Sequence, residues 1–182
     1  RIIGERYLAT LHSATAHEAA AEPVHRLFHA RLVDPDALER LGGRAARFYL
    51  DQPFQFPGLN MHWCDIGHRR WRINAVEYQG TLAGLFEESR QLLAPTNFAG
   101  AAVVAHGDAH NANVWCEDAE SATPRLVFFD PAFAGSHVPA LLAEIKATFH
   151  NIFAHPFWLY DAQLAAEKYR AAIRLRGEVL EV

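Results

Sequence analysis

Cysteine, methionine and lysine are all scarce in this chain of 182 residues. Its two cysteines, Cys64 and Cys116, are too few for a disulfide framework, and its first residues carry no signal-peptide pattern. No apolar run approaches the length of a membrane-spanning helix. Lys plus Arg number 17 against 21 for Asp plus Glu, so no broad basic surface for nucleic acid is expected. These absences predict a cytoplasmic protein with no nucleic-acid or membrane partner.

Apolar residues, by contrast, are plentiful. They make up 51% of the chain, which is enough for a buried core and excludes a disordered tail. The length predicts a single domain over residues 1–182. Because the chain begins at Arg1 and contains one Met, we expect it to be a fragment, a processed product or the ordered part of a longer chain.

Helical periodicity dominates the pattern along the chain. It predicts helices over residues 1–15, 23–32, 74–93, 139–153 and 161–174. Asp34 and Pro35 resemble the N-cap and first turn of a further helix, with Leu38 and Leu41 on its buried face. Residues 52–72 are rich in Pro, Gly, aromatics and His, and predict a long irregular excursion. Apolar runs at 101–105, 114–116 and 126–129 predict short strands, the last two forming a hairpin. The predicted class is α+β, mainly α with a small β-hairpin.

The densest polar cluster is His106-Gly107-Asp108-Ala109-His110-Asn111-Ala112-Asn113, between two apolar runs. Such a loop is costly to build unless it is solvated or functional. If strands 114–116 and 126–129 pair as a hairpin, Asn113 and Asp130 lie at the same end, and Asp108 is on the loop that leads there. Carboxylate and amide oxygens of this kind suit Mg²⁺, which takes further ligands from substrate phosphates. A carboxylate nearby but off the metal can orient a hydroxyl and accept its proton, which is the logic of phosphoryl transfer.

Two segments then resemble a known family. HGDAHNAN (106–113) followed by LVFFDPAFAG (126–135) is similar to the motif pair of the aminoglycoside phosphotransferase/choline kinase-like family, and LATLHS (8–13) resembles the first helix of that family's larger lobe. The specific part of the resemblance covers residues 103–135.

The resemblance implies a protein-kinase-like C-terminal lobe that moves the γ-phosphoryl group of ATP or GTP to a hydroxyl of a small molecule. It implies Asp108 as the catalytic residue, with Asn113 and Asp130 holding Mg²⁺ and the nucleotide. His106 and Gly107 match positions that shape the catalytic loop (106–113), and His110 matches a His common in the family. The metal motif is 130–135.

Two features depart from the family pattern. The second motif is usually followed by an acidic residue before the next helix, whereas the nearest acid here is Glu144. In addition, both lysines, Lys146 and Lys168, follow the motifs. No Gly-rich loop flanked by a predicted strand precedes the motifs. The N-terminal lobe, with its phosphate-binding Lys, is therefore predicted to be absent from this chain, which we expect to be a poor catalyst without it.

Two other functions stay open. One is a non-catalytic, pseudokinase-like binding module, which the missing lysine favours. The other is a zinc-dependent hydrolase, because His106, Asp108 and His110 alternate and would face one side of a strand, with His137 or Asp130 completing the site.

Three further patterns are weaker. His62, Cys64 and His68 have loosely ligand-like spacing, but a partly buried aromatic loop is the favoured interpretation. Arg69, Arg70 and Arg72 surround Trp71 and could bind phosphate or nucleic acid, although a solvated helix start is favoured. Aromatic and His residues of 149–160 are candidates for lining a substrate pocket.

Overall fold

The computed structural model describes residues 2–56, 58–153, 161–168 and 170–182. Length predicted one domain, whereas the packing divides the chain into two compact units. The first unit comprises Arg1–Leu27 and Ala94–Ala165, and the second comprises Phe28–Leu93 and Ala166–Val182.

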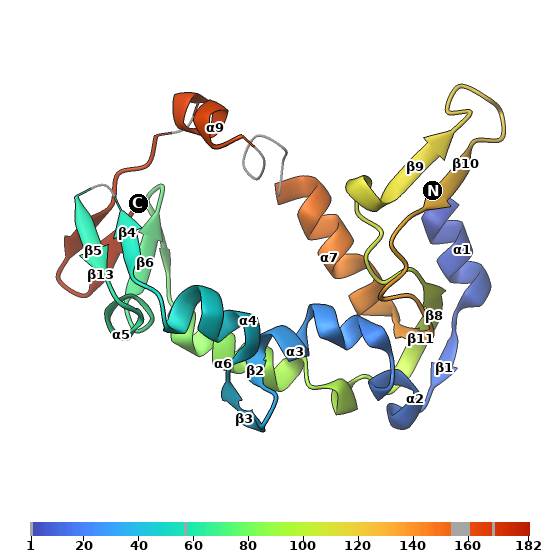
Figure 1. Cartoon of the computed structure of the whole chain (residues 1–182), viewed down its shortest axis with the longest axis horizontal. Helices are drawn as coiled ribbons and strands as arrows, with labels where there is room; N and C mark the ends of the chain where they lie inside the picture. The colour runs from blue at the N-terminus through green and yellow to red at the C-terminus, as the bar shows by residue number, and fades with distance from the viewer. Residues whose placement is uncertain (1, 57, 154–160, 169) are drawn as a thin grey trace. The chain divides into compact units, whose positions relative to one another are not determined.

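A three-stranded antiparallel sheet lies at the centre of the first unit (Figure 1). Its order is β1 (His12–Ala14), β8 (Gly100–Ala105) and β11 (Gly135–Pro139). The middle strand β8 is the predicted apolar run, and it buries Ala102, Val103 and Ala105. Strand β1 pairs with the first half of β8, and β11 pairs with β8 as far as Ala105, where the polar loop begins.

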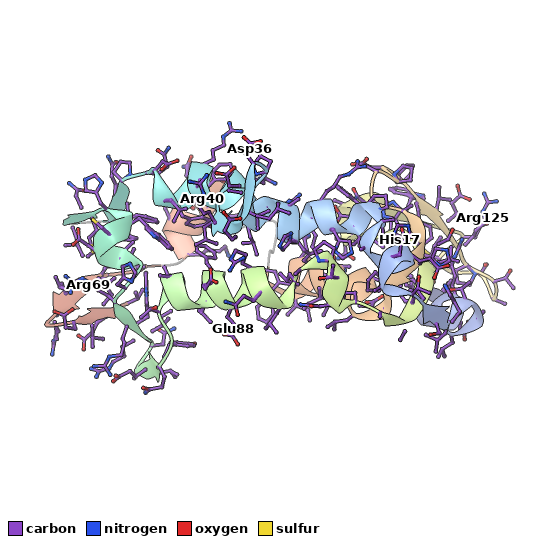
Figure 2. The ribbon with its side chains drawn as sticks, turned by 90° about the horizontal axis from the view of Figure 1, so that it is seen from below. His17, Asp36, Arg40, Arg69, Glu88 and Arg125 are labelled. Carbon is purple, nitrogen blue, oxygen red and sulfur yellow. The ribbon has the colours of Figure 1, made fainter. Side chains whose placement is uncertain are left out.

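The predicted β-hairpin is confirmed. Strand β9 (Val114–Glu117) pairs antiparallel with β10 (Arg125–Phe128), in a register that sets Val114 opposite Phe128. At its other end Arg125 forms an ion pair with Glu117 at the surface (Figure 2). This register determines which residues lie next to the Val114–Phe128 pair, at the end of the hairpin that adjoins the rest of the unit.

Helices surround these strands. The first unit contains α1 (Ile2–Thr10), α2 (Ala16–Ala20), η1 (Pro23–Leu27), η3 (Pro95–Asn97), η4 (Asn111–Asn113), α7 (Ala140–Phe153) and most of α9 (Ala162–Lys168). The helix predicted over 1–15 ends at Thr10, because residues 12–14 pair with β8 instead. Thr15 then caps α2 in a capping box with Glu18. The predicted helix over 139–153 is confirmed as α7.

The start of the second unit differs from the sequence prediction. Its first elements are α3 (His29–Leu32), β2 (Val33–Asp34), β3 (Ala37–Leu41), α4 (Gly43–Ala45) and η2 (Ala46–Leu50). The helix predicted after Asp34 is wrong, since β2 and β3 form a hairpin there. Asp34 accepts a hydrogen bond from the Asp36 backbone N–H at 2.9 Å, which turns the chain, and it pairs with Arg40 at the surface (Figure 2). Leu38 is accordingly exposed.

The rest of the second unit is richer in strands than expected. Residues 52–72 hold β4 (Phe54–Phe56), β5 (Leu59–Met61), α5 (Trp63–Ile66) and the start of β6 (Arg70–Ile73), so the irregular excursion was wrong. After β7 (Val76–Tyr78), the helix predicted over 74–93 is limited to α6 (Leu82–Leu92). Strands β12 (Arg174–Arg176), β13 (Val179–Glu181), β6 and β7 form one sheet in that order. Met61, Ile66 and Leu180, the last from β13, form a buried hydrophobic cluster.

The fold class is therefore α+β, with several small sheets among the described residues instead of one hairpin in a mainly helical protein. Strand β6 also replaces the helix start expected around Trp71. Over the described ranges, no helix combines the length and apolar character needed to cross a bilayer.

Candidate active site

The loop between β8 and β9 (residues 106–113) leaves its strand through a turn that requires glycine. Gly107 has φ +77°, and a Cβ there would lie 2.3 Å from the carbonyl oxygen of Phe133. His106 fastens the same turn from both ring nitrogens: Nε2 donates to the Phe129 carbonyl oxygen at 2.6 Å, and Nδ1 accepts from the Asp108 backbone N–H at 3.3 Å. One tautomer, protonated at Nε2, satisfies both bonds. His106 and Gly107 thus shape the loop.

Asp108 is the buried carboxylate of this loop, with 7% of the residue exposed. Its Oδ1 accepts a hydrogen bond from the ammonium of Lys146, and His110 Nε2 lies 3.7 Å from the same oxygen. Its backbone carbonyl accepts from the Asn113 side-chain amide at 3.0 Å and from the His110 N–H at 2.9 Å. Two bonds thus hold the backbone of Asp108, and its buried carboxylate is paired with the ammonium of Lys146.

Asn113 and Asp130 meet at the end of the hairpin, as predicted. Phe129 N–H donates to the Asn113 carbonyl oxygen at 2.9 Å, one step beyond the Val114–Phe128 pair, and Asp130 follows directly. Since the amide nitrogen of Asn113 is bonded to Asp108, its side-chain oxygen Oδ1 is the acceptor end. The described residues give no hydrogen-bond donor to Asn113 Oδ1 or to the Asp130 carboxylate. These two oxygens fit the hard-ligand chemistry of Mg²⁺.

Asp130 also has a strained backbone. Its φ is +53°, in the left-handed region that non-glycine residues rarely adopt, and its side chain is exposed. Aspartate tolerates this region better than most residues, but at a cost. Strain of this kind is concentrated at functional sites.

Helix α7 makes contacts with the loop that the sequence did not predict, through Lys146 and Asn151 as well as His150, which belongs to the candidate stretch 149–160. Figure 1 shows α7, in orange, beside the loop between β8 and β9, where Asn151 Oδ1 accepts from the Asn111 N–H at 2.8 Å. The ring of His150 stacks on His110 with centroids 4.1 Å apart. Lys146 and His150 lie on one helix face by their i, i+4 spacing, and this pair of basic residues on an amphipathic helix was the available signal.

His110 is electrically neutral near pH 7. Burial lowers the pKa of its imidazole below the usual value, and nearby His150 and Lys146 add to this effect while Asp108 opposes it. Its Nδ1 accepts from the Ala112 N–H at 3.2 Å, so the proton is on Nε2, toward Asp108. His110 therefore orients the loop as a neutral ring.

The zinc alternative finds no ligand set among the described residues, which contain no group of three or more His, Cys, Asp or Glu placed to share a metal ion. Both ring nitrogens of His106 are already hydrogen-bonded. His137 instead bonds His12, with 3.0 Å between His12 Nε2 and His137 Nδ1. His62, Cys64 and His68 likewise form no such group among the described residues.

A cavity of about 410 Å³ adjoins the loop within the first unit. It is lined by Ile3, Arg6, Tyr7, Val104, Ala105, His106, Phe128, Ala134, Gly135 and Ser136. Burial raises the pKa of Tyr7 to about 12, aided by the nearby carboxylate of Glu144. The cavity is large enough for part of a small molecule. Among the aromatic candidates of 149–160, Phe149 and Phe153 are exposed, whereas His155, Phe157, Trp158 and Tyr160 lie outside the described residues.

No protein-family model, curated protein or solved structure matches the chain. The resemblance to the aminoglycoside phosphotransferase/choline kinase-like family therefore stays a prediction that rests on the motif residues and their geometry.

Proposed function

We propose that this chain is the larger, C-terminal lobe of a kinase-like phosphotransferase that moves the γ-phosphoryl group of ATP or GTP to a hydroxyl of a small molecule. One juxtaposition carries the proposal: the hairpin register sets Asn113 beside Asp130, and the amide of Asn113 holds the loop at Asp108. An amide oxygen and a carboxylate that have no donor among the described residues thus lie at the same hairpin end, next to the loop that carries a buried carboxylate.

In the proposed reaction, Asp108 accepts a hydrogen bond from the acceptor's hydroxyl and takes its proton. The hydroxyl oxygen forms a bond to the γ-phosphorus as the bond from that phosphorus to its bridging oxygen breaks. The nucleoside diphosphate leaves with the electron pair of the broken bond. Asn113 and Asp130 would hold Mg²⁺, which supplies charge neutralisation to the phosphates when bound. The small-molecule acceptor follows from the family resemblance, and the adjoining cavity, which His106 lines, has the size for part of such a molecule.

Calorimetric titration with Mg·ATP and Mg·GTP tests the metal-binding half of the proposal. We expect the wild-type chain to bind one of them and Asp130→Ala to lose that binding without losing its thermal transition. Asp118→Ala is the matched control, because Asp118 is also exposed and has φ +52° in the same hairpin. No binding by the wild type, or unchanged affinity in a folded Asp130→Ala, overturns the assignment.

A binding module is the second candidate. It is favoured by the ion pair between Lys146 and Asp108, which occupies one oxygen of the carboxylate that phosphoryl transfer would need as a base. Transfer from γ-labelled ATP to a panel of small hydroxyl compounds separates the two functions. Nucleotide binding with no labelled product, with Asp108 intact, favours the binding module.

A further inference from the structure

Lys146 forms an ion pair with Asp108 that the reaction described above does not use. The ammonium is bonded to Oδ1 of Asp108, and the two side chains are 22% and 9% exposed. Lys146 is placed by the core of the first unit, since Leu142, Ala143 and Ala147 of α7 are buried on either side of it in sequence. The pair is therefore built into the packing of α7.

The ammonium of Lys146 has spare hydrogen-bonding capacity. It carries three N–H donors, and Asp108 Oδ1 is its one acceptor among the described residues. The side chain is also partly open to solvent. Two donors of a nearly buried cation are thus available to an anion that enters beside Asp108.

The proposed reaction brings such an anion to this place. An attacking hydroxyl bonded to Asp108 must approach the γ-phosphorus to roughly 3–3.5 Å. The oxygens of that phosphoryl group then lie within reach of an ammonium that is bonded to the same carboxylate. These oxygens carry negative charge in the transition state, and a fixed cation stabilises it.

We propose that Lys146 binds the transferring phosphoryl group while it holds Asp108, so that one ammonium positions the proposed base and contacts the phosphate. The inference rests on the proposed function. Lys146 keeps its protons throughout. The hydroxyl proton goes to Oδ2 of Asp108, because Oδ1 is paired with Lys146. The chain would thereby have a phosphate-binding lysine of its own on α7.

Calorimetry with Mg·ATP and Mg·ADP tests the contact, because only the triphosphate carries the group that Lys146 would bind. Lys146→Met keeps the stem but removes the charge, and we expect it to weaken Mg·ATP binding roughly tenfold while Mg·ADP binding changes little. Lys146→Arg should restore part of the preference for the triphosphate. Lys168→Met, which changes the only other lysine, should leave both affinities unchanged.

An equal loss, or no loss, for both nucleotides in a folded Lys146→Met would overturn the inference and leave Lys146 a structural role. Failure of the wild-type chain to bind either nucleotide would overturn the proposed function itself. If Lys146→Met does not fold, amine acylation of the wild-type chain, mapped by mass spectrometry, tests the same contact. Mg·ATP should protect Lys146 but not Lys168, and Mg·ADP should protect neither. Equal acylation of Lys146 with both nucleotides contradicts the inference.

Discussion

Two charged regions of this molecule use their charges in opposite ways. On β6 and its neighbours in the second unit, Arg70 and Arg72 both face Glu77, at 2.8 and 3.0 Å, and Arg72 also reaches Glu181 at 2.7 Å. In the loop between β8 and β9 of the first unit, Asp108 is buried on a single lysine, whereas Asn113 Oδ1 and Asp130 have no donor among the described residues.

The difference separates a structural network from a candidate site. Exposed charges that satisfy one another stabilise a fold only modestly, and they leave little capacity for a ligand. Buried charge, unpaired acceptors and a left-handed aspartate cost folding free energy, so they persist where another requirement keeps them. From the sequence, both the Arg69–Arg72 segment and the loop of residues 106–113 were candidates for binding phosphate. The structure distinguishes them, because the charges of Arg70 and Arg72 are paired with carboxylates.

The strongest test of this comparison removes the charge of Asp108. Asp108→Asn keeps an oxygen that can accept from Lys146, so the fold should persist, but the amide cannot take a proton. In a preparation where the wild type turns over, we expect phosphoryl transfer to fall by about 10²- to 10⁴-fold. Rates are compared with Asp118→Asn, an exposed change on the nearby hairpin. A rate within a few-fold of the wild type would remove Asp108 from the reaction.

The next test compares two glycines with positive φ, one from each unit. Gly107 (φ +77°) has the Phe133 carbonyl oxygen 2.3 Å from where a Cβ would lie, whereas Gly177 (φ +57°) has open space there. Both alanine variants pay for a left-handed backbone, roughly 1 kcal/mol, and Gly107→Ala adds a clash with the backbone. We expect a loss in the free energy of unfolding of roughly 3 kcal/mol for Gly107→Ala. Urea unfolding checks this order, and equal losses would contradict the close packing of the loop.

In the first unit the sequence predicted β8, the hairpin and α7, but neither β1 nor β11, which flank β8 in the central sheet. The β-branched and aromatic run at 126–129, the short run at 114–116 and the turn residues between them indicated a hairpin, and antiparallel geometry alone set Asn113 beside Asp130. The apolar stripe of α7 was equally plain. These elements were predictable because periodicity and turn chemistry agreed with the final packing.

Other parts depended on information that is not local. Asp34 and Pro35 suit a helix start and a turn equally, and pairing between β2 and β3 decided for the turn. Lys146 lies 38 residues after Asp108, so its contact follows from how α7 packs and not from any motif. The strands of the second unit are short, and one pairing that builds its largest sheet, β6 with β13, spans more than half the chain.

The smallest expected effect comes from the surface network of the second unit. Hydrogen bonding and charge from Arg72 lower the pKa of Glu77 below its usual value. A carboxyl with a lowered pKa in the folded state stabilises the protein above its unfolded pKa, and this contribution is lost as the pH falls through the folded value. Arg72→Met should therefore lower the thermal midpoint slightly at neutral pH, less so in acid, and less at high salt because exposed pairs are screened.

The same variant sharpens the comparison of the two regions. If paired surface charge is purely structural, Arg72→Met leaves Mg·nucleotide affinity at the wild-type value while Asp130→Ala abolishes it. Scanning calorimetry across pH and salt gives the first quantity, and nucleotide titration of the same protein gives the second. A fall in nucleotide affinity on changing Arg72 would show that the network binds phosphate. Pairing of charges in the fold would then not distinguish a structural network from a binding site.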